Sequence, residues 1–294
     1  MKLLDEFDAA VVFSELPKQQ INNGYLPKGS GKVYKTYLDN KSWQTVKDGM
    51  SDAHRTQYGA GSGGELEEKD GKPPKMAAFA SSSRMIYNLS KGLPDFRFEE
   101  KLSTTVGGTA NMDGYLEREN DHIFVEAKCR EPYGHQADQL IKQAYKPVYR
   151  WLRAKMPRVF SCVMEDCEDN NMHVVFFCKG KVVACFDIKQ MICHMLGVAT
   201  KLLKHPDGKD ILFLYLLYNP EALYFGNNTI DTVRSIWTDT CEAATQYRFD
   251  EMFRHIVDYL VQEKGIAASE QNIAHLKKAF HFELCDQNTY KNYF

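Results

Sequence analysis

The sequence predicts an α/β fold with a central mixed β-sheet flanked by helices and with helical additions at both ends. Short runs rich in β-branched and aromatic residues alternate with amphipathic patterns of helical period. Residues 211–218 are almost continuously apolar, as expected of a central strand that is covered on both faces. Residues 112–117 and 122–129 are two strand-like runs separated by four polar residues, which predicts a β-hairpin.

Composition limits the class of protein without fixing its function. With 294 residues, of which 44% are hydrophobic, the chain can build a substantial core. Its net charge of -2 provides no overall attraction for nucleic acid, so a phosphate-binding surface would have to be a local patch. Eight scattered cysteines without a CxxC pair, no signal-peptide pattern and no apolar run of ~18 residues predict a reduced, cytoplasmic protein without a membrane segment.

The N-terminal quarter carries weak signals. Asn40 or Ser42 could cap a helix that runs toward Tyr58. Residues 59–75 are rich in Gly, Pro and charge, which predicts a flexible loop or linker, with a flap that orders on DNA as the alternative. Three serines before residue 84 and Gly92 after it predict a short helix, and a first strand should follow over residues 96–105.

The hairpin brings ionisable groups together. If Glu117 pairs with His122, antiparallel register places Asp113 opposite Glu126, and strand alternation puts Lys128 on the same face. Two adjacent carboxylates repel each other and favour a bound cation. Mg²⁺, or Mn²⁺ in its place, suits an open pair of carboxylates. An ordinary solvated patch on an edge hairpin is the alternative.

The spacing of these residues resembles a known family. Asp113, twelve further residues and then Glu126-Ala127-Lys128, with apolar residues leading into the glutamate, are similar to the PD-(D/E)xK nuclease superfamily, which has the restriction-endonuclease-like fold. Within it, residues 81–220 resemble a group of bacterial restriction-endonuclease-like proteins. The resemblance implies that Asp113 and Glu126 bind the metal and that Lys128 is the catalytic lysine. It also implies a metal-activated water that leaves a 5′-phosphate and a 3′-hydroxyl.

The sequence departs from the family in two places, and a further role is open. Met112, rather than proline, precedes Asp113. The helix expected after the hairpin lacks the Gln-x-x-x-Tyr motif of RecB-type exonucleases. Many relatives add an acidic residue from the preceding helix or first strand. Glu99 and Glu100 both qualify, and Glu100 is included with the catalytic residues, although strand alternation would turn only one of the two inward.

A long helix is expected over residues 135–156, with Pro147 kinking or dividing it. Basic residues recur along one side at steps of three or four, which suits a row that tracks phosphates, although a solvated face would look the same. Two glutamines one turn apart could reach the active site or a base edge. The expected substrate-binding residues are therefore Gln139, Gln143, Lys142, Lys146 and Arg150.

The remaining pattern completes the fold. Strands are expected over residues 159–164, 173–178 and 182–188, and a helix over 189–204 in which His194 is expected to be structural. Two helices over 231–247 and 249–263 precede an aromatic tail that docks on the body. The chain is divided into a helical preface with a flexible loop (1–75), a nuclease-like core (76–220) and a C-terminal helical region packed on the core (221–294).

Together these features predict a Mg²⁺-dependent nuclease that hydrolyses DNA, most simply a restriction-type endonuclease. A homodimer would supply the two active sites that symmetric cleavage of both strands requires. Two alternatives remain open. One is a non-cleaving nucleic-acid-binding or assembly module that keeps the fold, and the other is a repair nuclease that acts on branched DNA or on RNA.

Overall fold

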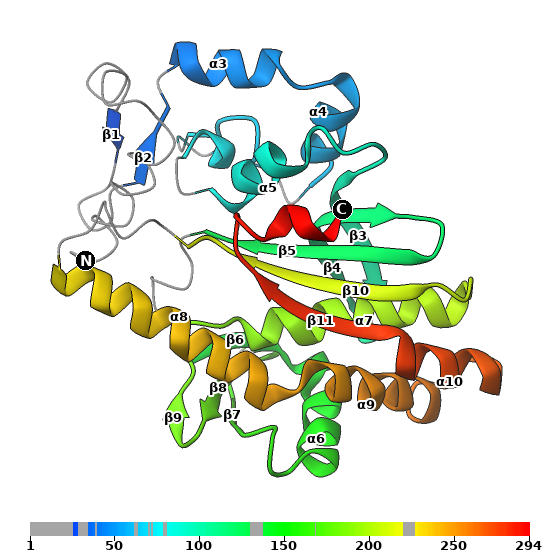
Figure 1. The fold of residues 1–294 in the computed structure, drawn as a ribbon. Helices are drawn as coiled ribbons and strands as arrows, with labels where there is room; N and C mark the ends of the chain where they lie inside the picture. Colours follow the sequence, from blue (N-terminus) through cyan, green and yellow to red (C-terminus); the bar gives the residue numbers. More distant parts are fainter. Residues whose placement is uncertain are drawn as a thin grey trace.

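The described part of the chain is built around a five-stranded mixed β-sheet (Figure 1). The computed structural model describes residues 26–28, 35–38, 40–61, 64–69, 71, 73–78, 81–129, 138–167, 169–219 and 227–294. The strand order across the sheet is β11-β10-β5-β4-β3. Helices flank this sheet and lie at both ends of the chain, so the predicted α/β class with a central mixed sheet is confirmed.

The sheet joins an antiparallel meander to a parallel pair. β3 (Arg97–Thr104), β4 (Gly108–Glu117) and β5 (Asp121–Lys128) are antiparallel to one another in turn. β10 (Asp210–Leu217) runs parallel to β5, and β11 (Phe280–Cys285) runs parallel to β10. The apolar run at 211–218 is therefore a central strand, as predicted.

A hydrophobic core lies on each face of this sheet. α5 (Ser82–Ser90) covers one face, with α3 (Asn40–Asp48) and α4 (Asp52–Gly59) on the same side (Figure 1). α7 (Ile188–Lys204) covers the other face, with α9 (Phe249–Gln262) packed against it. We call these the α5 face and the α7 face.

Local sequence explains where the covering helices begin. The hydroxyl of Ser81 accepts a hydrogen bond from the Arg84 backbone N–H, so the predicted serine cap of α5 is confirmed. In α7 the carboxylate of Asp187 accepts from the Gln190 N–H at 2.9 Å. Asp187 therefore fixes the residue at which α7 begins.

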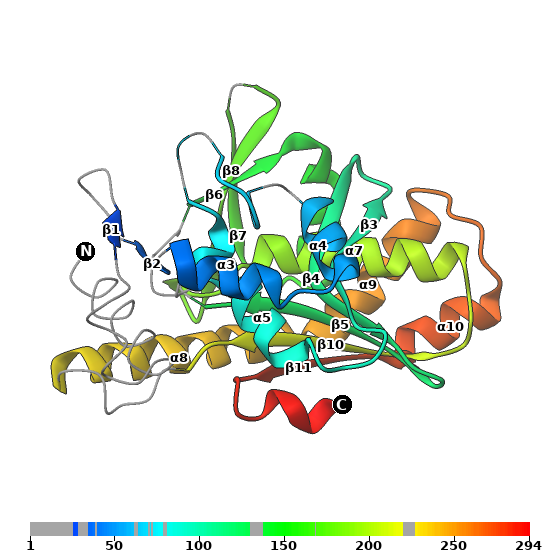
Figure 2. The same ribbon diagram turned by 90° about the horizontal axis from the view of Figure 1, so that it is seen from above.

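A second, smaller sheet is inserted between β5 and α7. β6 (Asp138–Lys142), β8 (Asn171–Cys178) and β7 (Cys162–Asp166) pair antiparallel in the order β6-β8-β7, and β9 (Lys181–Val182) pairs with β8. Figure 2 shows these strands on the opposite side of α7 from β11. In the sequence, this insertion lies between the β4–β5 hairpin and α7, the helix that packs on the hairpin.

The helix expected over residues 135–156 is wrong in its first half. The stretch from 138 to 142 is strand β6, in which Gln139 and Ile141 are buried while their neighbours are exposed, a period of two. The 3₁₀ turn η3 (Gln143–Tyr145) follows, and α6 (Lys146–Lys155) begins only there. Pro147 lies in the first turn of α6, where its missing N–H costs nothing, so it starts the helix instead of kinking it. Residues 130–137 lie outside the described part.

The C-terminal segment contributes more to the sheet than expected. After α8 (Asn227–Tyr247) and α9, helix α10 (Glu270–Ala279) leads directly into β11, which forms one edge of the sheet. The aromatic residues of the tail are therefore partly strand residues. The turn η5 (Tyr290–Tyr293) then packs on the α5 face through Tyr290, whose hydroxyl lies 2.8 Å from that of Ser90.

The described residues of the N-terminal region contain more regular structure than the expected helical preface and loop. The strands β1 (Leu26–Lys28) and β2 (Lys35–Tyr37) form a small hairpin. The expected single helix up to Tyr58 is two helices, α3 and α4, separated at residues 49–51. Within the expected loop, Glu65 and Leu66 are buried, and η1 (Lys75–Ala77) follows. Every helix among the described residues is too short or too polar to cross a lipid bilayer.

Contact between α7 and the meander depends on Gly197. A Cβ at this position would lie 2.8 Å from the Cβ of Leu102 and 3.0 Å from that of Ala110. We expect Gly197→Ala to lower the free energy of unfolding by about 1–2 kcal/mol, because the overpacking cost exceeds the gain in helix propensity. Urea denaturation would measure it. Gly59→Ala is the matched control, since it also lies in a helix but meets nothing within 4 Å and should be neutral or stabilising.

Candidate functional site

The candidate site is located where β4 and β5 separate. The predicted hairpin register is confirmed over four pairs, from Glu117 opposite His122 to Gly114 opposite Val125. The pairing stops there, one residue short of the expected pair of Asp113 and Glu126, while β4 stays paired with β3. Instead, the Oδ2 of Asp113 accepts a hydrogen bond of 2.7 Å from the backbone N–H of Ala127.

Both β3 and β4 change face at this point. Phe98 packs on the α5 face, whereas Leu102, four residues later, packs on the α7 face. Met112 and Leu116 of β4 show the same switch, and the β3–β4 register omits the pair of Glu99 and Asp113. Regular alternation would keep residues four apart on one face. The irregularity therefore falls on the two acidic residues themselves.

Glu126 and Lys128 lie together on the α7 face, as predicted. The side chains are 1% and 10% exposed, and Lys128 Nζ lies 2.5 Å from Glu126 Oε1. Lys128 also donates a hydrogen bond of 2.6 Å to the side-chain oxygen of Gln190, in the first turn of α7. The ammonium group is thereby oriented by β5 and by α7 together.

His194 lies one turn after Gln190, beside the same carboxylate. Its Nδ1 is 3.4 Å from Glu126 Oε2, and its ring is buried. Burial, together with the charge of Lys128, lowers the pKa of His194 to about 3, against the opposing effect of a hydrogen bond with the Asn111 backbone. The imidazole is therefore neutral at physiological pH, and its contact with Glu126 is not an ion pair.

A second group of carboxylates lies beside Asp113. Burial and the charges of Asp113 and Glu65 raise the pKa of Glu99 to about 8, although Lys75 and Lys101 act in the opposite direction. Glu65 is 4% exposed and accepts hydrogen bonds from Lys75 Nζ at 2.6 Å and from the Ser83 hydroxyl at 2.9 Å. Three carboxylates from separate parts of the chain thus share one environment.

The backbone of Glu99 is itself unusual. Its φ is +54°, in the left-handed region that costs a non-glycine residue about 1 kcal/mol or more. Gly61 lies against its carboxylate, so that a Cβ on Gly61 would come within 2.8 Å of Glu99 Oε2. The fold maintains this conformation even though it turns an acidic side chain toward other acids.

This donor set fits a divalent cation. Carboxylate oxygens are the ligands that Mg²⁺ prefers, and Asp113, Glu99 and Glu65 supply them in excess of the nearby cations. Burial is the largest cause of the raised pKa of Glu99, repulsion by Asp113 and Glu65 adds to it, and a bound dication would relieve that repulsion. Asp113 and Glu126, the expected metal ligands, lie on either side of the fork between β4 and β5.

Of the two glutamates left open by the sequence, Glu99 lies with Asp113. Glu100 is directed to the α7 side, where its carboxylate lies 3.4 Å from Lys201 Nζ and 3.7 Å from Arg97 Nη1. Only one of the two glutamates faces Asp113, as alternation requires. Because the strand changes face at Glu99, that residue is Glu99 and not Glu100. The inclusion of Glu100 in the catalytic set is thus not supported by its position.

The expected substrate-binding residues do not form a row on one helix. Gln139 and Lys142 belong to β6, where Gln139 is buried. Gln143 starts η3 and donates to the Asn171 carbonyl, and Lys146 pairs with Asp166. Arg150 lies exposed on α6. Of the five, Lys142 is the one that lines a pocket on the α7 side.

Two residues at the site were not expected from the sequence. Glu65 lies in a segment whose composition indicates a linker, and its burial depends on long-range contacts. Gln190 has a signal in the sequence, but it lies in a later helix than the one expected to follow the hairpin. The helix that covers the hairpin is α7, beyond the inserted sheet, and its first turn carries a glutamine four residues before His194.

Another group of potential ligands lies at the opposite end of the hairpin. Glu117, His122 and Asp207 have ligand atoms within 4.8 Å of one another. The His122 ring is hydrogen-bonded to the Asp207 carboxylate at 2.7 Å and to the Tyr115 hydroxyl at 2.8 Å. Lys209 Nζ forms an ion pair with the Glu117 carboxylate at 2.8 Å. These contacts account for the group as a network that closes the hairpin.

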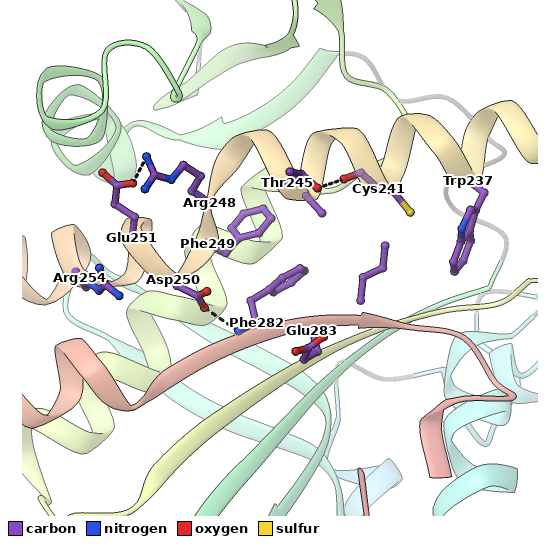
Figure 3. A pocket seen from close by; sticks show the side chains of 12 residues that line it. Trp237, Cys241, Thr245, Arg248, Phe249, Asp250, Glu251, Arg254, Phe282 and Glu283 are labelled. Atoms are coloured by element: carbon purple, nitrogen blue, oxygen red, sulfur yellow. Dashed lines mark hydrogen bonds and ion pairs between the residues drawn. The ribbon is translucent and has the colours of Figure 1, made fainter. Parts of the chain in front are cut away.

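Of two pockets lined by residues that the structure describes, the larger lies at the outer edge of β11, two strands from β5. It has a volume of about 600 Å³ between α8, α9 and β11 (Figure 3). Its charged groups join these elements: Asp250 accepts from the Phe282 N–H, and Glu251 pairs with Arg248. The other pocket, of about 340 Å³, adjoins the first turns of α7.

Comparison with known proteins adds no assignment. No family model matches the sequence, and no curated protein or solved structure is significantly similar to it. Function has to be argued from the site itself.

The raised pKa of Glu99 makes stability depend on pH. A carboxyl group whose pKa is about 8 in the folded state binds more protons than in the unfolded state, so the free energy of unfolding should fall as pH rises from about 4.5 to 8. Glu99→Gln should remove this loss and exceed wild type at pH 8 by about 1–3 kcal/mol. Urea titrations across that range would measure it, and equal slopes for both proteins would contradict the assignment.

Proposed function

We propose that this protein is a Mg²⁺-dependent nuclease that hydrolyses phosphodiester bonds of DNA, with a site of the PD-(D/E)xK type. The observation that supports the proposal is the fork of β4 and β5, where Asp113 accepts a hydrogen bond from the N–H of Ala127, the residue between the buried pair Glu126 and Lys128. An endonuclease of restriction type is the simplest form of this activity.

The residues divide the work as follows. Asp113 and Glu99 would hold Mg²⁺, which would supply Lewis acidity and a nucleophilic water at neutral pH. Glu126, on the α7 face, would hold Lys128 in place. Lys128 Nζ, held by Gln190, would donate a hydrogen bond to a non-bridging phosphate oxygen and stabilise the charge that develops on it. Neutral His194 lies 3.4 Å from the other oxygen of the Glu126 carboxylate and adds no charge to the site.

One observation favours a second candidate, a non-cleaving nucleic-acid-binding module. Glu126 is 1% exposed and already in contact with Lys128, so the pair could be a structural ion pair inside an inactive fold. Glu99, Asp113 and Glu65 are three carboxylates near two lysines, Lys75 and Lys101, and this donor set favours a bound cation and hence the nuclease.

The first test is cleavage of supercoiled plasmid with Mg²⁺ or with chelator. We expect metal-dependent nicking or linearisation that falls at least 100-fold in Glu126→Gln and in Lys128→Met, because the second variant removes the group that acts on the reacting phosphate and the first removes the carboxylate that holds it. Single-stranded DNA, branched DNA and RNA, assayed in parallel, would identify the preferred substrate.

The controls separate chemistry from folding. Loss of one partner of a buried pair can cost about 3–5 kcal/mol, so the double variant Glu126→Gln/Lys128→Met, which leaves no unpaired charge, is assayed and its thermal unfolding is measured. Glu117→Gln breaks a glutamate–lysine pair at the other end of the hairpin and should keep activity within about 3-fold. Binding of nucleic acid without turnover in the wild type would favour the non-cleaving module.

Glu99 and Glu100 form a matched pair for the metal site. We expect Glu99→Gln to raise the Mg²⁺ concentration needed for half-maximal cleavage about 10-fold or more, and Glu100→Gln to change it less than 3-fold. Stabilisation by Mg²⁺ at pH 8, followed by thermal unfolding, gives a second readout. The reverse order of the two variants would move the metal to the α7 face beside Glu100.

A further inference from the structure

The smaller pocket lies on the α7 side of the sheet, along the first turns of the helix that contacts Lys128 and Glu126. Its wall includes Lys189 and Cys193 of α7, and Gln190 and His194, the neighbours of these residues, contact Lys128 and Glu126. The same helical turns therefore serve both places. On the β4 side the pocket reaches Thr109, four residues from Asp113, or about 14 Å along the strand.

The pocket is apolar inside and basic at its rim. Leu140, Ile141 and the ring of Tyr145 supply the apolar wall, and the Tyr145 hydroxyl is held 3.3 Å from Cys193 Sγ. The volume of about 340 Å³ is at the small end of ligand sites, which suits one planar ring system and part of a sugar. Gly108 leaves room for Tyr145, since a Cβ there would lie 2.5 Å from its hydroxyl.

The charges favour a phosphate. Lys142 and Lys189 line this pocket and no acidic residue does, a formal charge of +2. Neither lysine has an acidic partner within the described ranges, whereas nearby Lys146 is neutralised by Asp166. The pocket at β11 contains two arginines and three acids, a formal charge of -1, and so lacks this complementarity.

We infer that the smaller pocket receives one unstacked nucleobase of the substrate strand, with the adjoining phosphate on Lys142 and Lys189. The inference rests on the proposed nuclease function and specifies its substrate as nucleic acid with an accessible, unpaired or extruded nucleotide near the scissile bond. Stacking on an aromatic ring is a sequence-tolerant way to hold such a base.

Binding can be measured without cleavage. In the presence of chelator, fluorescence anisotropy compares a short single-stranded DNA with an abasic strand of equal length, which carries the same phosphates. We expect wild type to bind the base-containing strand about 10-fold more tightly, as one stacked base provides. Equal affinity for the two strands would overturn the inference.

Leu140→Glu and Val163→Glu are matched variants. Both residues are 51% exposed and lie in the inserted sheet, but only Leu140 lines the pocket. The ratio of the two affinities cancels the general effect of the added charge. Leu140→Glu should abolish the preference for bases and Val163→Glu should keep it, and a preference unchanged by Leu140→Glu would refute the pocket.

The two lysines have a separate readout. Lys142→Ala/Lys189→Ala should weaken both strands alike and reduce the slope of log affinity against log salt by about 1.4, as two lost phosphate contacts predict. An unchanged slope would remove the lysines from the interface. If plasmid, RNA and branched DNA all resist cleavage while the base preference persists, the nuclease proposal fails and the pocket stands as a nucleic-acid-binding site.

Discussion

The arrangement of the site depends on one hydrogen bond, from the Ala127 backbone N–H to the carboxylate of Asp113. Where β4 leaves β5, the ladder loses its backbone acceptors, and a buried N–H without a partner is costly. Asp113 supplies the missing acceptor, so the strands can separate here without leaving the Ala127 N–H unpaired. The fork that results leaves a carboxylate at a position that a regular ladder would have closed.

The same irregularity determines which charges meet. Because β3 and β4 change face together, Glu99 turns toward Asp113 and Glu65, and Glu100 turns toward Lys201 and Arg97. A strained residue that places an acid among acids lowers stability, and such strain is found where a site needs it. The excess of negative charge on one side of the fork and the oriented lysine on the other are complementary to a cation and a phosphate, respectively.

Much of the fold could be predicted because the signals were local. The hairpin register followed from residue spacing, the cap of α5 from its serines, and the central strand from eight apolar residues in succession. The face of Lys128 followed from alternation because β5 is regular. Alternation failed for Glu99, since nothing in its neighbours indicates a left-handed residue inside a strand. Glu65, Gln190 and β11 were missed for a shared reason: their places are set by contacts with residues far away in the sequence.

The inserted sheet explains why composition gave no indication of nucleic acid. A net charge of -2 describes the whole surface, whereas binding depends on where unpaired cations lie. Several lysines around the sheet pair with a local acid, such as Lys201 with Glu100 and Lys209 with Glu117. Lys142 and Lys189 have no such partner within the described ranges, and they come from elements that meet only because the insertion folds back against α7. A small surface can therefore be basic and attract anions even though the protein as a whole is acidic.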